Sequence, residues 1–151
     1  MPIRPALFAI CATTLALCAP CSIAQPSDDG VIHQLRIYEI FQNNKQAFHD
    51  RFRDDAARIM SKYDFKIVAM WESRTPERTE FVYLLEWPDE ATLKDRWAKF
   101  MQDQEWKDIK KRTGAQHGVM VGDIEDRKLR ATEYSPQKVL LPSESDNQKR
   151  E

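Results

Sequence analysis

Cysteine is confined to the first 21 residues of this chain, at Cys11, Cys18 and Cys21. If that segment is removed on export, the remaining protein has neither a disulfide nor a thiol nucleophile. Glycine is also scarce, with 4 residues in the whole chain, and no glycine-rich loop that could hold a phosphate is present. These absences argue against disulfide scaffolds, thiol catalysis and phosphate-binding loops.

A surplus of one charge is missing as well. Arg4 is the only charged residue before Asp28, and removing it leaves 22 of the 23 basic residues against 24 acidic ones, a net charge of −2 with histidine neutral. Nucleic-acid binding requires a basic surface, so we expect no nucleic-acid partner.

The N-terminal residues have the pattern of a secretory signal. A short apolar run spans residues 6–19, and Ser22-Ile23-Ala24 places small residues at the two positions that a signal peptidase reads. The run is shorter than the roughly 20 residues of a membrane span. We expect residues 1–24 to be cleaved and the protein to be periplasmic or secreted, with no transmembrane segment after cleavage. The alternative is a retained membrane anchor.

Lipid anchoring is disfavoured by the residues that precede the cysteines. Leu17 lies before Cys18 and Pro20 before Cys21, whereas a lipidated cysteine follows a small residue. We therefore expect the exported protein to be free of a lipid anchor.

The remaining chain alternates between strand and helix patterns. Four segments are predicted to be strands, because they are rich in β-branched and aromatic residues or have alternating apolar residues. They span residues 31–41, 65–73, 80–87 and 119–124, and the last strand could continue to residue 132. Apolar residues at helical spacing predict a helix that begins at Asn43 or Asn44 and ends at Asp64, with Arg51 on its solvent face. A second helix is expected to begin at Asp89. A third is expected to begin at Asp103 and to end near Gly114. The order β-α-β-β-α-β, with an extra short helix, predicts an α+β ferredoxin-like domain with a four-stranded antiparallel sheet.

The domain is expected to span residues 31–136, between a flexible leader at 25–30 and a polar tail at 137–151. The tail is expected to be mobile, although Val139-Leu140-Leu141 offers an apolar segment that can dock.

The third predicted strand is apolar on both faces, which indicates that both faces of the sheet are covered. The predicted helices cover one face of the sheet only, and the other face is called the open face below. This open face carries one of two sets of residues: Val82 and Leu84, or Phe81, Tyr83 and Leu85. Large exposed apolar patches mark interfaces. A second copy is the simplest cover, and we expect a homodimer.

Three short motifs resemble the NIPSNAP family: Leu35-Arg36-Ile37-Tyr38, Gln104-Glu105-Trp106 and the segment from Leu129 to Pro136. The resemblance covers residues 31–136. It implies a ferredoxin-like protomer that pairs sheet to sheet into a dimeric α/β barrel, and it implies no particular reaction. Asn43-Asn44-Lys45 replaces the family's Pro-Gly-Lys type turn, which implies a different loop at one end of the barrel.

The histidines do not form a metal motif, because His33, His49 and His117 lie on different predicted elements without ligand spacing. We expect no bound metal and no cofactor. His33 is expected on the helix side of the sheet with Leu35, and His117 at the start of the last strand. Both remain candidates for acid–base or ligand-binding roles.

Arg36 and Tyr38 are stronger candidates. If Leu35 and Ile37 face the helices, alternation sends Arg36 and Tyr38 into the barrel interior, where an unpaired arginine is costly. We expect Arg36 to meet a carboxylate, either Glu72 or Glu86. Two interpretations remain: an ion pair that sets the dimer register, and a pocket in which Arg36 binds an anionic group.

These features predict a binding or interaction module that holds a small apolar or anionic ligand. The alternative is a cofactor-independent monooxygenase, or another small-substrate enzyme, with its site inside the barrel; this rests on analogy of fold alone. The sequence does not decide whether the protein is an enzyme.

Overall fold

The computed structural model describes residues 30–141. The predicted signal at 1–24 lies outside the described residues, as do most of the leader and residues 142–151 of the tail. The elements follow the predicted order: β1 (Ile32–Ile40), α1 (Lys45–Asp50), η1 (Arg51–Ala56), α2 (Ala57–Lys62), β2 (Lys66–Arg74), β3 (Thr79–Trp87), α3 (Glu90–Gln102), α4 (Gln104–His117) and β4 (Val121–Leu129).

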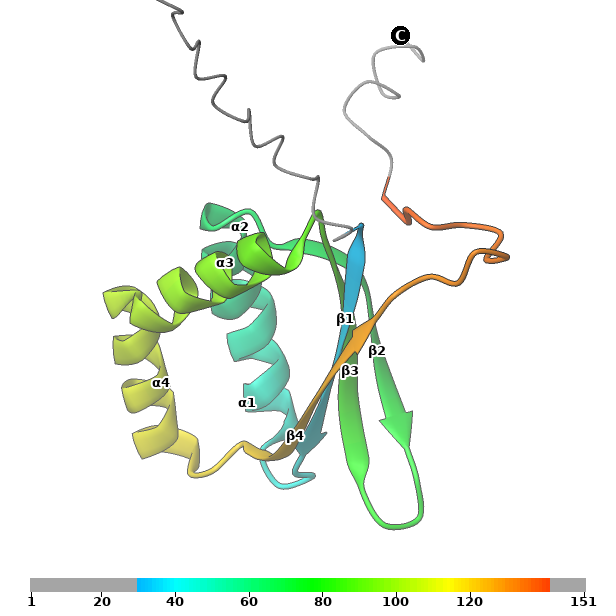
Figure 1. Cartoon of the computed structure of the whole chain (residues 1–151). Coiled ribbons are helices and arrows are strands. Elements are labelled where there is room, and N and C mark those ends of the chain that lie inside the picture. The colour runs from blue at the N-terminus through cyan, green and yellow to red at the C-terminus, as the bar shows by residue number, and fades with distance from the viewer. Residues whose placement is uncertain (1–29, 142–151) are drawn as a thin grey trace, which may run out of the picture.

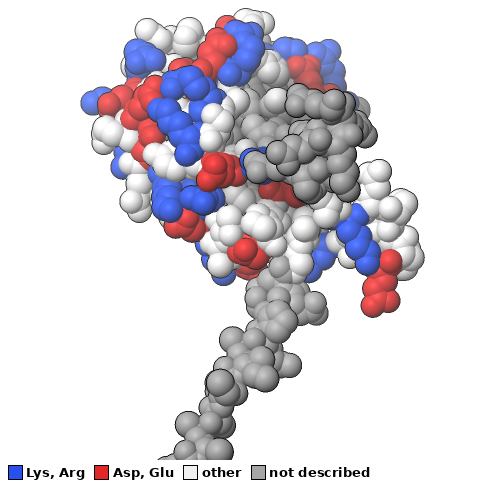
Figure 2. Space-filling model, turned by 90° about the horizontal axis from the view of Figure 1, so that it is seen from above, with Lys and Arg blue, Asp and Glu red and all other residues white. Residues whose placement is uncertain are grey.

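The strands form one antiparallel four-stranded sheet in the order β2-β3-β1-β4. The helices lie on one face of this sheet, and no helix of residues 30–141 covers the other (Figure 1). This arrangement confirms the predicted α+β, ferredoxin-like fold. Basic and acidic side chains alternate over the surface seen in Figure 2, without a large area of one sign.

α1, η1 and α2 form one continuous segment, here called the first helical segment. Phe48, Phe52, Ala56 and Ile59 are buried along it, as their spacing predicts. Asp64 follows it with φ +56, the left-handed conformation that aspartate tolerates better than most residues. The middle turns, η1, are π-helical, a wide geometry that is rare and is often found at functional sites.

The first helical segment starts at the predicted position but without a side-chain cap. Asn44 occupies the cap position, but its side chain makes no capping hydrogen bond. Instead, its Nδ2 donates to the backbone oxygens of His117 and Val119, at 2.9 and 2.8 Å. The side chain therefore joins the start of this segment to the connection between α4 and β4.

The caps of α3 and α4 are confirmed. Asp89 accepts a hydrogen bond from the backbone nitrogen of Thr92 at 2.6 Å, and Asp103 accepts one from that of Trp106 at 2.8 Å. α4 continues beyond Gly114 and ends at His117, because the positive φ of +73 that stops the helix occurs at Gly118. His117 is therefore the last residue of α4 and not the start of β4.

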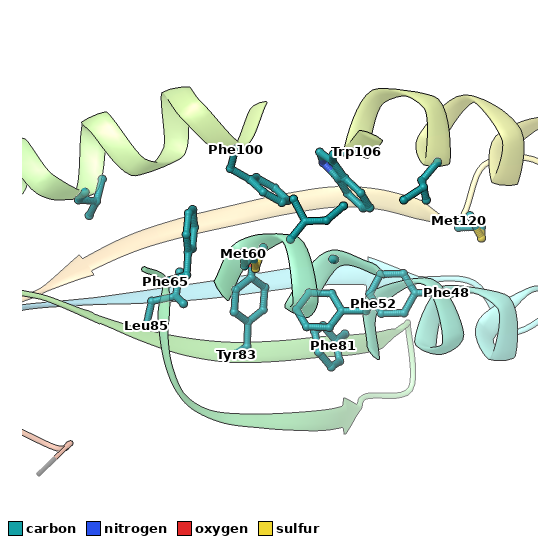
Figure 3. Packing of buried hydrophobic residues seen from close by; sticks show 14 of the residues in the cluster. Phe48, Phe52, Met60, Phe65, Phe81, Tyr83, Leu85, Phe100, Trp106 and Met120 are labelled. Atoms are coloured by element: carbon teal, nitrogen blue, oxygen red, sulfur yellow. The ribbon is translucent and has the colours of Figure 1, made fainter. Parts of the chain in front are cut away.

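The core lies between the sheet and the helices. Phe81, Tyr83, Leu85 and Trp87 of β3 all have buried side chains on this side. Figure 3 shows Phe81 and Tyr83 rising from β3 toward the helices, with Phe100 and Trp106 close to one another above them. Many contacts in this core are between aromatic rings, so its stability depends on ring packing as well as on buried area.

The predicted orientation of β1 is wrong. Gln34, Arg36 and Tyr38 point toward the helices, because Arg36 pairs with Tyr83 in the β1–β3 register and Gln34 with Leu85, both buried in the core. The polar atoms of Gln34 have partners there: its Oε1 accepts from the indole nitrogens of Trp87 and Trp97, at 3.1 and 2.8 Å. A buried polar side chain is tolerated when its hydrogen bonds are made.

The open face consequently carries the other residues of β1. Leu35 lies opposite Leu84, and Ile37 opposite Val82, so the pair Val82 and Leu84 occupies this face rather than Phe81, Tyr83 and Leu85. Trp71 of β2 lies beside Val82 and is half exposed. The result is an apolar patch in the middle of an uncovered sheet.

His33 shares this open face with Leu35, and not the helix side. Its Nε2 lies 3.1 Å from Oε2 of Glu86, the residue opposite it on β3. The same Glu86 oxygen accepts hydrogen bonds from the backbone nitrogens of Leu140 and Leu141, at 2.5 and 3.4 Å. Leu140 and Leu141, which were predicted to be able to dock, thus contact the edge of the open face.

Candidate functional site

A cavity of about 260 Å³ lies between β1, β4 and the helices. It is called the sheet–helix pocket below. Its walls are mainly aromatic and aliphatic, with three cations and one phenol among them. The residues that line it are Arg36, Tyr38, Phe48, Arg51, Phe52, Ala56, Met60, Trp97, Phe100, Met101, Trp106, Lys110, Val121 and Ile124.

Arg36 lies on the sheet side of the pocket with a charge that is already compensated. Its Nη1 donates to Oδ2 of Asp126 at 2.6 Å, its Nη2 donates to the Tyr38 hydroxyl at 3.2 Å, and its guanidinium lies 4.8 Å from the ring centroid of Trp97. Asp126 is the residue directly opposite Arg36 on β4. The predicted partners, Glu72 and Glu86, are therefore wrong, because that prediction placed Arg36 on the other face of the sheet.

The pKa of Arg36 reflects both burial and its neighbours. Burial by itself lowers this pKa, but Tyr38, Tyr83 and Asp126 raise it, and the net shift is upward from the ordinary value. Arg36 is therefore a permanent cation whose main partners belong to the protein.

Two tyrosines adjoin Arg36. The hydroxyls of Tyr38 and Tyr83 lie 2.8 Å apart, and their rings meet edge to face at 5.4 Å. Burial raises the pKa of Tyr83 well above its usual range. Tyr83 therefore remains a neutral phenol at physiological pH.

Arg51 and Lys110 lie on the helix side of the pocket, at the ring of Trp106. The guanidinium carbon of Arg51 is 5.8 Å from the ring centroid, and Nζ of Lys110 is 5.6 Å from it. Such distances permit cation–π attraction. Within residues 30–141 neither cation forms an ion pair with a carboxylate; Arg51 donates only to the Thr113 hydroxyl, at 3.2 Å.

Burial lowers the pKa of the Arg51 guanidinium, with a smaller opposing effect from Asp55 and Tyr38. The sequence interpretation placed Arg51 on the solvent face of its helix and did not single out Lys110. A signal for Lys110 existed, because a residue four positions after Trp106 lies beside it on the same helix. Arg51 had no such signal, since the wide turn that begins there is not visible in the sequence pattern.

The other predicted site residues lie elsewhere. Glu72 is at the surface, bonded to Nζ of Lys45 at 2.9 Å and to Nε2 of His49 at 3.2 Å. His33 and Glu86 pair on the open face, and His117 is exposed at the end of α4. Of the six predicted residues, the pocket therefore brings together Arg36 and Tyr38 alone.

A larger hollow of about 720 Å³ lies at the surface between the start of α1 and the end of α4. It contains side chains of both charges, including Lys45, Asp50 and Asp54, and Arg51 lines it as well. In the described part of the chain no group of three or more His, Cys, Asp or Glu side chains is arranged to bind a metal. None of the helices in residues 30–141 is long and apolar enough to span a membrane.

The fold and the pocket define the class: a ferredoxin-like α+β domain with a mainly apolar pocket between its sheet and helices. The sequence pattern of the NIPSNAP family matches residues 33–136, and the chain belongs to this family. The family resemblance of the three short motifs is thereby confirmed.

Solved structures agree with this assignment. An uncharacterized NIPSNAP-like domain protein from Burkholderia xenovorans is similar, with 17% identity, a TM-score of 0.62, and coverage of 78% of this chain and 99% of its own. A NIPSNAP family protein from Agrobacterium tumefaciens has 19% identity and a TM-score of 0.60, with coverage of 70% and 97%. At these identities the likeness concerns the fold. No curated protein matches the chain.

Proposed function

We propose that this chain is an exported, homodimeric NIPSNAP protein that binds a small, mainly apolar molecule in the sheet–helix pocket. The observation that carries the proposal is the pocket itself. About 260 Å³ of space is bounded mainly by aromatic and aliphatic side chains, with few polar groups among them. Pockets with such linings are the usual sites of small-molecule binding.

The size of the pocket argues against a packing defect. Protein interiors contain few voids larger than a water molecule, and one water occupies about 30 Å³ of liquid. A cavity of about 260 Å³ is many times larger. It is smaller than the roughly 300–1,000 Å³ of sites for drug-sized ligands, so the ligand is a small molecule.

The lining favours binding over catalysis. General acid–base catalysis works best with a pKa near the operating pH. No histidine, aspartate or glutamate is found among the described residues that line the pocket. Arg36 has a raised pKa, so it is a poor proton donor at neutral pH. An oxygenase or other small-substrate enzyme would have to rely on Tyr38, the single phenol of the lining.

The open face supports the dimer. Leu35, Ile37, Val82 and Leu84 form its centre, and Trp71 lies beside them with 50% of its surface exposed. Apolar patches of this kind on soluble domains mark interaction surfaces. Pairing two such faces would bury both patches and close the sheets into a barrel.

Ligand binding can be tested by closing the pocket. Ile124 lines it from β4 and is 50% exposed, so Ile124→Phe adds a ring at the rim without entering the core. Val119→Phe is the matched control, because Val119 is 73% exposed and does not line the pocket. The probe is 1-decanol, and calorimetry is the measurement.

We expect binding to the wild type and to Val119→Phe, and a loss of at least tenfold in affinity for Ile124→Phe. Equal binding by all three proteins would show that the alcohol binds elsewhere. No binding to any of them would contradict a pocket for small apolar molecules.

A further inference from the structure

We infer that the sheet–helix pocket is selective for anions, and that Arg51 and Lys110 hold an acidic head group at Trp106 while the apolar body lies inside. The inference rests on the proposed function, since it specifies the class of molecule that the pocket binds. It assigns the recognition of charge to two residues on the helix side of the pocket instead of to Arg36.

Positive charge in the sheet–helix pocket exceeds negative charge. The pocket is lined by three cations and no carboxylate among its described residues. Arg36 is neutralised by Asp126 at 2.6 Å and is further bonded to Tyr38. Arg51 and Lys110 have no such partner within residues 30–141; Asp55, the carboxylate that acts on Arg51 electrostatically, is not within ion-pair distance of it. The uncompensated positive charge is therefore at Arg51 and Lys110.

The two cations lie beside the same buried ring, that of Trp106. Trp106 has 9% of its surface exposed, its ring stacks on that of Phe100 at 5.3 Å, and its backbone nitrogen is held by Asp103. The guanidinium carbon of Arg51 and Nζ of Lys110 lie 5.8 and 5.6 Å from the centroid of this ring. They come from different elements, η1 and α4, and both line the pocket beside this ring.

Their surroundings strengthen the preference for an anion. Both side chains are only partly exposed, so their charges are partly removed from water, and this burial lowers the pKa of the Arg51 guanidinium. A guanidinium and an ammonium bind carboxylates through charge-assisted hydrogen bonds, and arginine can do so with two parallel bonds. A bound acid would therefore compensate charges that are partly removed from water, which a neutral molecule would not do.

The geometry points to a ligand with one acidic group. Apart from Arg51 and Lys110, the polar groups of the lining are Arg36, which is paired with Asp126, and the Tyr38 hydroxyl, so a second charge on the ligand would meet no unpaired cation there. The volume of about 260 Å³ suits a short body. The class is thus a small monocarboxylic acid with an aliphatic or aromatic body.

The test compares three probes of one length on the protein recovered after export: decanoate, 1-decanol and decylamine, each measured by calorimetry at pH 7. Decanoate can accept hydrogen bonds from Arg51 and Lys110 with its charged carboxylate. Because hydrogen bonds to charged groups are stronger than those between neutral groups, we expect decanoate to bind roughly tenfold more tightly than decanol. Decylamine is expected to bind more weakly than either. Increasing salt should reduce the affinity for decanoate and leave that for decanol nearly constant.

Two variants locate the charge. Arg51→Met and Lys110→Met keep an unbranched side chain that can still lie on Trp106, and each should lower decanoate affinity toward that of decanol. Lys111→Met is the matched control, because Lys111 is exposed on the same helix and does not line the pocket; it should keep the selectivity.

The outcomes separate this inference from the proposed function. Equal binding of decanoate and decanol to the wild type would overturn the inference and leave the pocket as a site for apolar molecules. Selectivity for decanoate that survives both variants would also overturn it, because another group would then hold the acid. If none of the three probes binds, both the inference and the proposed function are wrong.

Discussion

Arg36 and Asp126 face each other across β1 and β4, with Nη1 of the arginine 2.6 Å from Oδ2 of the aspartate. The arginine side chain is 14% exposed and the aspartate 41%. Asp126 also accepts two hydrogen bonds from Nε2 of Gln34, both at 2.9 Å. One carboxylate thus satisfies two polar side chains that point toward the core.

Removing this carboxylate is expected to destabilise the protomer. Asp126→Ala leaves a largely buried guanidinium and an amide without their partner. We expect a loss of about 1–2 kcal/mol in the free energy of unfolding. This value is at the low end of what hydrogen bonds to charged groups contribute to stability, because Asp126 is partly solvated. Urea unfolding measures the loss.

Asp123→Ala is the control, because Asp123 is exposed on the same strand. A variant at Asp126 as stable as the wild type would contradict the structural role of the pair. Arg36→Ala should likewise lower protomer stability. It should not change the dimer directly, since Arg36 lies on the helix side of the sheet.

The proposed dimer depends on the open face. Leu84→Asp places a charge in the middle of the apolar patch formed with Leu35 and Val82, and burying that charge in an interface would be costly. We expect the wild type to sediment with twice the chain mass at micromolar concentration and Leu84→Asp to sediment as a monomer. Unchanged far-ultraviolet circular dichroism would show that the fold is retained.

Val119→Asp serves as the comparison, because this apolar residue is 73% exposed and lies in the connection between α4 and β4, outside the strands that form the patch, so the dimer should stay intact. A wild type that sediments as a monomer would contradict the pairing of open faces.

Acid should weaken the contact between α4 and α2. Glu105 accepts hydrogen bonds from Arg58 and Lys62, both at 2.5 Å, and these bonds lower its pKa from 4.5 to about 2. A lowered carboxyl pKa stabilises the folded state above the unfolded pKa, and this contribution is lost as the pH falls from 4.5 through about 2. The Glu105→Gln variant lacks this stabilising contribution at every pH.

We therefore expect the wild type to have a higher Tm than Glu105→Gln at pH 6, by a few degrees at most because the group is exposed and screened. The difference should shrink as the pH falls below 4.5. Glu77→Gln, an exposed residue of the β2–β3 turn, controls for loss of a surface charge. A Tm difference that does not depend on pH would contradict the assignment.

If the protein is exported, cleavage of its signal gives the mature chain a defined N-terminus. If residues 1–24 are a signal, protein recovered from the native host begins at or near Gln25. N-terminal sequencing checks this prediction, and intact Met1 on protein recovered from the cytosol would contradict it.

The order of the elements was open to sequence reasoning because it depends on local signals. Asp89 and Asp103 begin helices through bonds to nitrogens three residues away, and Asp64 ends one by adopting a positive φ. The spacing of Phe48, Phe52 and Ala56 likewise identified a buried helix face. Each signal lies within a few residues of the feature that it predicts.

The pocket could not be predicted in the same way. Alternation along β1 separates Gln34, Arg36 and Tyr38 from Leu35 and Ile37, but it does not say which set faces the helices. Hydrophobicity favoured burying Leu35 and Ile37 against the helices, whereas the protein buries the polar set.

The tertiary structure decided this orientation, because the partners of the polar set come from distant parts of the chain. Asp126 belongs to β4, Trp97 to α3 and Tyr83 to β3. Together they bond the polar groups of this set, except Nε of Arg36, which is buried without a hydrogen-bond partner among the described residues. Arg51 and Lys110 likewise reach the ring of Trp106 from different elements. The chain by itself determined the succession of strands and helices, and folding decided which side chains meet, because the energy of a buried polar group depends on partners remote in sequence.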